Sequence, residues 1–217
     1  MSKSIRNLWI PIFSAIVLVG FVVILIVPAS REVFSGVSDA HPYIMGFIKF
    51  ALLATVGELL STSLRNKRWS APVKVPARLL IWGLIGVWIT YMMKIFPNGV
   101  SALMASGLLP GGDSTFLRAL FTSMTMNLTF GPTFMAVHKC TDKWLELRAA
   151  NGGKAGGLRP VIEGIDWHGF VTFTLFKTVP LFWIPAHTIT FLLPSSYQVI
   201  MAAALSVALG IFLSLRK

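Results

Sequence analysis

The chain has 217 residues, of which 55% are hydrophobic and 12% are charged, and its formal net charge is +11. Soluble proteins carry about 25% charged residues, so this composition excludes a soluble globular domain and predicts an integral membrane protein. The basic residues flank the apolar runs, so the net charge does not indicate nucleic-acid binding. The single cysteine, Cys140, excludes an internal disulfide.

Six apolar runs predict membrane-spanning helices, because each is about 18–23 residues long. In chain order they cover 8–28, 43–64, 78–96, 116–138, 167–192 and 195–215. The first run is longer than the core of a signal peptide, so residues 1–31 are predicted to be an additional, uncleaved helix. The whole chain, 1–217, is predicted to form one membrane domain, an all-α polytopic bundle.

The distribution of Lys and Arg predicts the orientation of these spans. The two termini and the loops 65–78 and 139–166 hold 14 of the 19 Lys and Arg residues. Cytoplasmic loops are rich in Lys and Arg, so both termini are predicted to be cytoplasmic. Segment 97–113 is bounded by turn signals and too short to span, which predicts a short helix at the outer interface. The lack of an Arg- and Ser-rich leader favours a bacterial plasma membrane, or an organellar membrane in a eukaryote.

Four Lys, Glu and His side chains lie well inside predicted spans, away from the span ends, namely Lys49, Glu58, Lys177 and His187. Charges in spans usually face a bundle interior or a water-filled cavity. A rise of about 1.5 Å per residue puts Glu58 and Lys177 at comparable depths, so one interpretation is a structural ion pair between them. The other is a polar pathway that attracts anions. For His187 alone, a hydrogen-bonded interior histidine is the simpler interpretation.

The fourth span contains Asn127 among several hydroxyl side chains. Asn127 is predicted either to bond a neighbouring helix or to face the polar core. Pro132, Pro180 and Pro185 are predicted to break their helices. Each frees a carbonyl group, which must then face protein or cavity water.

Small residues recur at every fourth position of the last span, a spacing that predicts close helix packing. They are Ala202, Ser206 and Gly210. The four histidines are spread over different depths and show no metal-ligand spacing. We therefore expect no metal, no cofactor and no enzymatic activity.

Three stretches share a pattern with one family of membrane proteins. FWIPAHTITFLLP (182–194) carries Trp183, Pro185, Phe191 and Pro194, the stretch 41–64 carries His-Pro and Gly-Glu, and 117–136 carries a central proline. Together they resemble the Mpv-seventeen and peroxisomal twenty-two-kilodalton membrane protein family over 41–217. The chain departs from that pattern at Thr190 and Gln198, where the family has Asn and Arg. The resemblance implies a small helical membrane protein linked to channel-like conductance and metabolite homeostasis.

These patterns together predict a channel or transporter-like bundle that passes small polar, anionic solutes. Its polar core would be lined by Lys49, Glu58, Asn127, Lys177 and His187. The alternative is a membrane scaffold or assembly protein whose charges within the spans serve structure alone. The expected partners are the lipid bilayer, small anionic solutes and further copies of the chain, and not nucleic acid.

Overall fold

The structure is a computed structural model that describes the backbone of residues 7–215 and the side chains of residues 7–211. Within residues 7–215 it contains helices and no strand, which confirms the all-α class. Four helical segments are long and apolar enough to cross a membrane, and this is compatible with an integral membrane protein. They are Trp9–Ile26, Pro42–Arg65, Val75–Ala105 and Trp167–Leu192.

The chain divides into two compact units. Unit 1 comprises residues 1–91 and 195–217, and unit 2 comprises residues 92–194. Unit 1 contains helices α1 (Trp9–Ile26), α2 (Pro28–Ala40), α3 (Pro42–Arg65), the first part of α4 (Val75–Ala105) and α10 (Ser195–Leu215).

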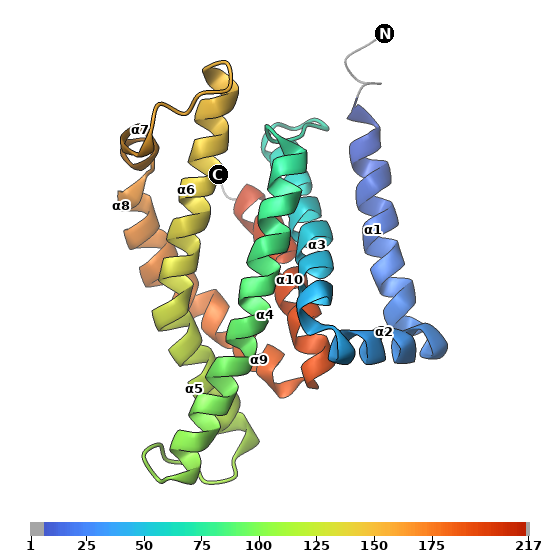
Figure 1. The fold of residues 1–217 in the computed structure, drawn as a ribbon, viewed down its shortest axis with the longest axis vertical. Helices are drawn as coiled ribbons and strands as arrows, with labels where there is room; N and C mark the ends of the chain where they lie inside the picture. Colours follow the sequence, from blue (N-terminus) through green and yellow to red (C-terminus); the bar gives the residue numbers. More distant parts are fainter. Residues whose placement is uncertain (1–6, 216–217) are drawn as a thin grey trace. The chain divides into compact units, whose positions relative to one another are not determined.

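Prolines separate the first three helices of unit 1. Val27 is extended, with φ −75° and ψ 120°, and Pro28 opens α2. His41 is likewise non-helical, and Pro42 opens α3. A residue before proline avoids the helical conformation, while proline suits a first turn because its missing N–H has no partner there. Figure 1 shows the result, with α2 lying across the ends of α1 and α3.

Glycines allow α3 to approach its neighbours closely. A Cβ added to Gly57 would lie 3.1 Å from the Val207 Cα of α10, and one added to Gly210 would lie 3.2 Å from the Gly57 carbonyl oxygen. On another face of α3, Gly46 leaves no room for a Cβ beside Gly86 O and Thr90 of α4. The predicted small-residue packing face of the last helix is confirmed at Gly210.

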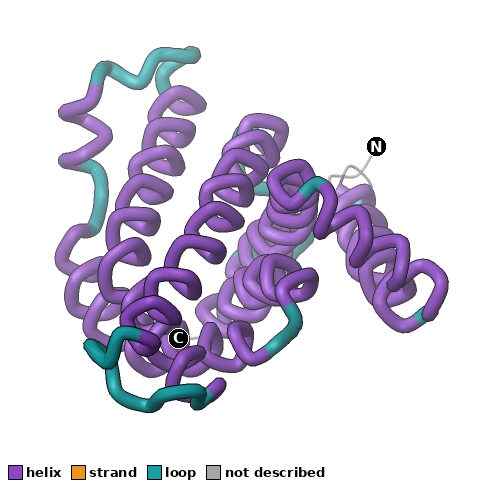
Figure 2. The backbone as a smooth tube through the Cα atoms, turned by 60° about the horizontal axis from the view of Figure 1, so that its bottom comes forward, coloured by secondary structure: helices purple, strands orange, loops and turns teal. Residues whose placement is uncertain are grey.

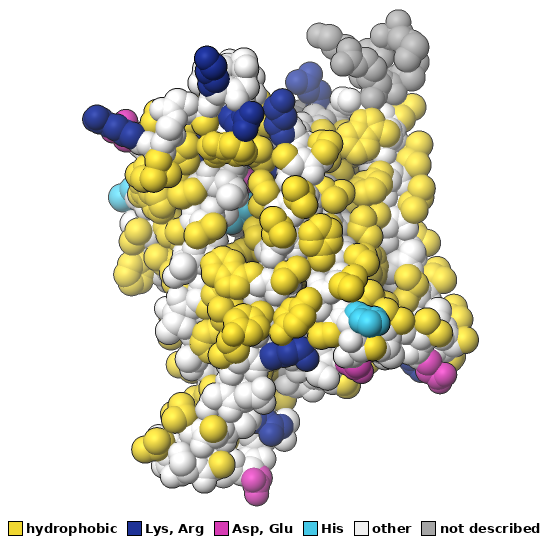
Figure 3. All heavy atoms as spheres, in the orientation of Figure 1, with side chains coloured by type: hydrophobic (Ala, Val, Ile, Leu, Met, Phe, Trp, Pro, Cys, Tyr) yellow, Lys and Arg dark blue, Asp and Glu magenta, His cyan; other side chains and the backbone are white. Residues whose placement is uncertain are grey.

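Unit 1 exposes a broad apolar surface (Figure 3). In α1 the exposed large apolar side chains are Trp9, Ile12, Ile16, Val19, Val22, Val23 and Ile26. The buried stripe of α1 is narrow and consists of Ile10, Ser14 and Val17. Such a surface suits contact with lipid chains, because water would leave this apolar area unfavourably solvated.

Unit 2 holds the second part of α4 and the helices that follow it as far as Leu192. Figure 2 draws all helices of the chain in purple and the loops in teal. The helices that follow α4 in unit 2 are α5 (Thr115–Thr125), η2 (Met126–Phe130), α6 (Gly131–Ala150), α7 (Leu158–Glu163), α8 (Trp167–Gly169), η3 (Phe170–Trp183) and α9 (Ile184–Leu192). Segments η2 and η3 are π-helices. Ser114 caps α5 by accepting a hydrogen bond from the Leu117 N–H at 3.3 Å.

The predicted helix-breaking prolines change the helix type instead of interrupting the helix. Pro132 lies in the first turn of α6, directly after η2, where the Gly131 N–H bonds to the Met126 carbonyl five residues earlier. Pro180 lies inside η3, and Pro185 lies in the first turn of α9. Proline cannot donate and clashes with the carbonyl four residues earlier. The wider π turns accommodate this clash, so the helical path continues.

Residues 97–113 differ from the prediction of a separate interfacial helix. Residues 97–105 continue α4 through Pro97, and residues 106–114 form a loop. The helix continues because Val100 and Met104 are buried, so packing outweighs the proline. Predicted spans 116–138 and 195–215 are helical, and their crossing of a membrane stays a prediction.

Candidate polar core

The five predicted core-lining residues are distributed over both units. Lys49 and Glu58 lie on α3 of unit 1. Asn127, Lys177 and His187 lie on η2, η3 and α9 of unit 2. Each unit by itself therefore contains a cluster of polar side chains.

The first cluster surrounds Lys49, whose side chain is 2% exposed. Its Nζ donates a hydrogen bond to Ser38 Oγ at 2.8 Å and lies 4.5 Å from the centre of the Phe34 ring. Phe34 and Ser38 are the buried residues of α2, four positions apart and so on one face. Asp39, the next residue, attracts the ammonium electrostatically. The hydroxyl and the ring satisfy the cation without carrying a negative charge.

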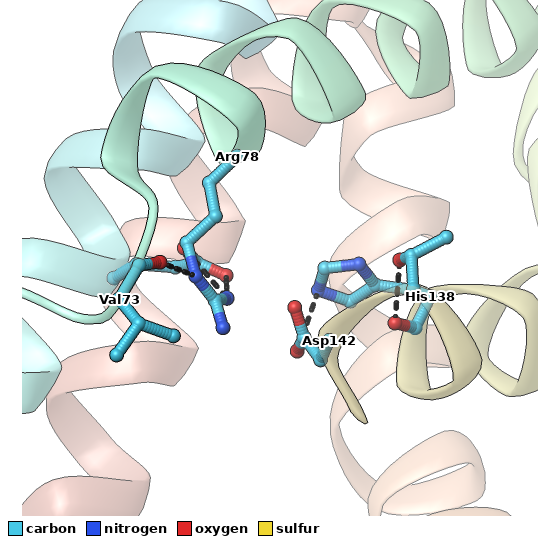
Figure 4. Close-up of polar contacts among 6 residues, drawn as sticks. Val73, Arg78, His138 and Asp142 are labelled. Atoms are coloured by element: carbon cyan, nitrogen blue, oxygen red, sulfur yellow. Dashed lines mark hydrogen bonds and ion pairs between the residues drawn. The ribbon is translucent and has the colours of Figure 1, made fainter. Parts of the chain in front are cut away.

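Glu58 has a different ion-pair partner from the one predicted. Arg78 Nη1 lies 3.0 Å from Glu58 Oε1 and 3.2 Å from Oε2. Arg78 Nε also donates to the Val73 carbonyl oxygen at 2.9 Å, as Figure 4 shows. The side chain of Lys177, the predicted partner, is exposed.

The position of Arg78 explains this difference. The prediction counted Arg78 among the loop cations, whereas the structure places it in the first turns of α4. The loop 66–74 is short, so the start of α4 lies beside the last turns of α3, within reach of Glu58. A carboxylate two turns before a short loop and an arginine just after it are the sequence signal for such a pair.

The second cluster joins two residues that were both predicted to line the core. Asn127 Oδ1 lies 3.1 Å from His187 Nδ1. Asn127 Nδ2 donates to the Ser123 carbonyl oxygen at 2.8 Å, so Oδ1 is the acceptor and His187 Nδ1 is the donor. The His187 ring stacks on Trp183 with ring centres 5.1 Å apart. The imidazole is therefore held from its face and from its edge.

Ser123, which was not predicted as a site residue, lies on α5 and connects that helix to α9. Its Oγ donates to the Ile184 carbonyl oxygen at 2.7 Å and lies 3.2 Å from Asn127 Nδ2. The same carbonyl accepts a hydrogen bond from Thr188 Oγ1 at 2.7 Å. Ser123 is four residues before Asn127, so both share one helix face. The four-residue spacing between Ser123 and Asn127 was the sequence signal that could have identified Ser123 as part of the cluster.

A further polar pair lies on α6. His138 Nε2 is 3.5 Å from Asp142 Oδ2, one helical turn later, and Figure 4 shows the two side chains facing each other. Thr141 Oγ1 donates to the His138 carbonyl oxygen at 2.7 Å. Imidazole and carboxylate are also metal-ligand types, and the expectation that no metal binds stays a prediction.

Comparisons with family models, curated proteins and solved structures give no match to this chain. The resemblance to the Mpv-seventeen and peroxisomal twenty-two-kilodalton family therefore stays a prediction. It rests on the motifs around His41, Pro132 and Trp183. Functional inference consequently depends on the chemistry of the two clusters.

The clusters share one chemical property, which is hydrogen-bond donation from buried or half-buried side chains on helices. Unit 1 offers the Lys49 ammonium, and unit 2 offers the amide and imidazole N–H groups of Asn127 and His187. Donors placed in a medium of low dielectric constant interact strongly with negatively charged or polarised groups. Such groups can either hold helices together or bind a passing anion.

Proposed function

We propose that this chain is an integral membrane channel or transporter-like protein that passes small anionic solutes. The observation that carries the proposal is the burial of Lys49 in α3 with a hydroxyl and an aromatic ring as its contacts. Glu58, the acidic residue of the same helix, is already paired with Arg78. The negative charge of Asp39 offsets part of the positive charge of Lys49, and the remainder is available to attract anions within the span.

The proposal includes the predicted membrane arrangement. Six spans with both termini in the cytoplasm, in a bacterial plasma membrane, account for the distribution of Lys and Arg in the sequence. Membership of the Mpv-seventeen and peroxisomal twenty-two-kilodalton family is part of the same proposal, and so is self-association of the chain. Its support is the set of motifs and the four long apolar helices.

Flux into liposomes tests the transport proposal. Purified protein is reconstituted, and the influx of chloride and inorganic phosphate is compared with that of potassium. We expect anions to pass in preference to potassium, and Lys49→Met to lower anion flux about tenfold, which corresponds to about 1.4 kcal/mol in the barrier. Lys94→Met is the matched control, because it removes an exposed cation. Anion flux that is equal in Lys49→Met and wild type would contradict the role of Lys49.

A second candidate function is a non-transporting membrane scaffold. The observation that favours it is the mutual bonding of Ser123, Asn127 and His187, in which the donors find protein acceptors. Buried polar groups that serve structure are bonded in this way. The same liposomes distinguish the two functions. A scaffold gives no flux above protein-free liposomes, and Lys49→Met then changes the folding yield alone.

A further inference from the structure

The loop between α3 and α4 carries an unusual concentration of positive charge. The exposed cations are Lys67, Arg68 and Lys74 of the loop and Arg65, the last residue of α3. Between Glu58 and Asp113 the sequence contains no acidic residue. Glu58 itself is engaged by Arg78, as described above. The four exposed cations therefore have no acidic neighbour along this part of the chain.

Hydrogen bonds hold the backbone of this loop in one conformation. Ser63 Oγ donates to the Ser70 carbonyl oxygen at 3.0 Å, and the Ser70 N–H donates back to Ser63 Oγ at 3.1 Å. Asn66 Nδ2 donates to Ser70 Oγ at 2.8 Å, and Asn7 Nδ2 donates to the Trp69 carbonyl oxygen at 2.7 Å. The cations thus project from a fixed loop, which lowers the entropy lost when they bind a partner.

Two residues of the loop adopt a backbone conformation that L-amino acids rarely use. Lys67 has φ 50° and Lys74 has φ 58°. This left-handed conformation is strained for a residue that carries a Cβ atom. Both positions are lysines and both side chains are exposed. The loop therefore presents both lysine side chains on the surface despite the strain in its backbone.

Apolar side chains are exposed beside the cations. Trp69 is 44% exposed and Val73 is 42% exposed. Tryptophan concentrates where the hydrocarbon core meets the headgroups, with its ring in the apolar layer and its N–H near water. An exposed tryptophan among lysines and arginines, at the end of two long apolar helices, matches the boundary between the apolar and charged layers of a bilayer.

We propose that loop 66–74, together with Arg65, binds the headgroups of anionic phospholipids. The cations attract the negatively charged phosphate groups, and the apolar side chains of Trp69 and Val73 contact the apolar layer beneath the headgroups. A soluble anion would use the cations alone and leave the apolar pair exposed. The proposal rests on the membrane-spanning arrangement proposed above, and it does not require transport.

The cations of unit 2 provide a contrast within the same chain. Lys143 Nζ lies 2.7 Å from Glu146, and Arg159 Nε lies 2.7 Å from Glu163. Lys143 and Arg159 are neutralised by neighbours one turn away, whereas within residues 7–211 no such pair is seen for the four loop cations. Unit 2 therefore supplies a control in which the same number of positive charges is removed, two of them from such pairs and one, Lys154, from an exposed position.

The test measures lipid-dependent stability of the full chain in a neutral detergent. Wild type is compared with a loop variant, Lys67→Gln with Arg68→Gln and Lys74→Gln, and with a control variant, Lys143→Gln with Lys154→Gln and Arg159→Gln. Thermal unfolding is followed with added phosphatidylglycerol, phosphatidylcholine or inorganic phosphate. A ligand that binds only the folded state stabilises it by RT ln(1 + L/Kd), where L is the concentration of free ligand, so tighter binding at the same lipid concentration gives a larger rise in melting temperature.

We expect phosphatidylglycerol to stabilise wild type and the control variant, and the loop variant to bind it about a hundredfold more weakly. Sodium chloride at high concentration should weaken this binding, because it screens exposed charges. Quenching by brominated phosphatidylglycerol should fall in Trp69→Phe. Equal binding by the loop variant and wild type overturns the proposal. So does an equal loss in both triple variants, or stabilisation by inorganic phosphate as large as that by the lipid.

Extraction of cell membranes with alkaline carbonate separates this proposal from the membrane arrangement on which it rests. Release of the chain into the supernatant means that the spanning arrangement is wrong. A chain that stays in the membrane but shows no preference for phosphatidylglycerol overturns the loop proposal alone. Flux in liposomes is an independent readout, because the loop variant retains Lys49.

Discussion

Asn127 and His187 meet across two helices of unit 2, with Oδ1 of the amide 3.1 Å from Nδ1 of the imidazole. The two residues are 60 positions apart in the chain. The amide orientation is fixed because Asn127 Nδ2 donates to the Ser123 carbonyl oxygen. The pair therefore links η2 to α9 through one directional hydrogen bond between an amide and an imidazole.

We predict measurable coupling between these two residues. Asn127→Leu and His187→Phe each remove the bond, and phenylalanine keeps a ring beside Trp183. In a double-mutant cycle the coupling free energy should be about 0.6–1.7 kcal/mol, as for polar pairs between membrane helices. Unfolding in mixed detergent micelles measures it. Thr129→Val is the control partner for His187→Phe, because exposed Thr129 bonds to its own helix. Additivity within about 0.3 kcal/mol would mean that the bond contributes nothing.

A second prediction concerns Glu58 and Arg78. Glu58→Gln or Arg78→Met should each lower the free energy of unfolding by up to about 3–5 kcal/mol, because each leaves one charge without its partner. The double variant should recover a large part of that loss. Lys177→Met should change stability by less than about 0.5 kcal/mol, since its side chain is exposed. Denaturation of the purified variants checks all four values. A large loss in Lys177→Met alone would restore the originally predicted pairing.

Local backbone chemistry explains what could be predicted from the sequence. Pro28 determines where α1 ends and Pro42 where α3 begins, and predicted spans 8–28 and 43–64 lie within two residues of the observed helices. The burial of Lys49 and Asn127 followed from the cost of placing a polar group against lipid. The effect of a proline on its neighbours and the polarity of a side chain within an apolar run can both be read from a short stretch of sequence.

Partner identities could not be predicted in the same way, because they depend on tertiary packing. Depth along a helix put Glu58 level with Lys177, but depth alone does not specify which neighbouring helix faces the carboxylate. The short loop before Arg78 brings a nearer cation to it. Likewise, Asn127 and His187 were both identified, and their contact depends on α5 packing against α9. Helix continuation through Pro97 also depends on the burial of Val100.

A third prediction tests the close packing of α3 on α10. Gly57→Ala places a methyl group 3.1 Å from the Val207 Cα, a backbone atom that cannot rotate away. Such overpacking should lower stability by about 1–3 kcal/mol. Gly36→Ala is the control, because nothing lies within 4 Å of its added Cβ in α2. There the gain in helix propensity should raise stability by about 0.5–1 kcal/mol. If Gly57→Ala leaves the free energy of unfolding unchanged or raises it as Gly36→Ala does, the tight α3–α10 contact is contradicted.

The last prediction decides how many helices cross the membrane. Six spans place Asn66 and Asn151 in the cytoplasm and Gly36, Asp113 and Ser195 outside. If only the four long apolar helices cross, Asn66, Gly36 and Asp113 keep their sides. Asn151 then lies outside and Ser195 in the cytoplasm, because the helices between Thr115 and Ala150 and α10 no longer cross. These two positions therefore distinguish the arrangements.

Cysteine labelling measures the sides directly. Cys140 is first replaced by serine, and single cysteines are introduced at these five exposed positions. A membrane-impermeant maleimide is applied to intact spheroplasts and to inverted vesicles. We expect Asn151→Cys to react in inverted vesicles and Ser195→Cys in spheroplasts, because the cations of loop 139–166 favour the cytoplasm. The reverse result at both positions supports four spans, and Asn66→Cys, which reacts in inverted vesicles under either arrangement, verifies vesicle orientation. Labelling of Gly36→Cys and Asn66→Cys from one side would contradict both arrangements, since α3 separates them in each.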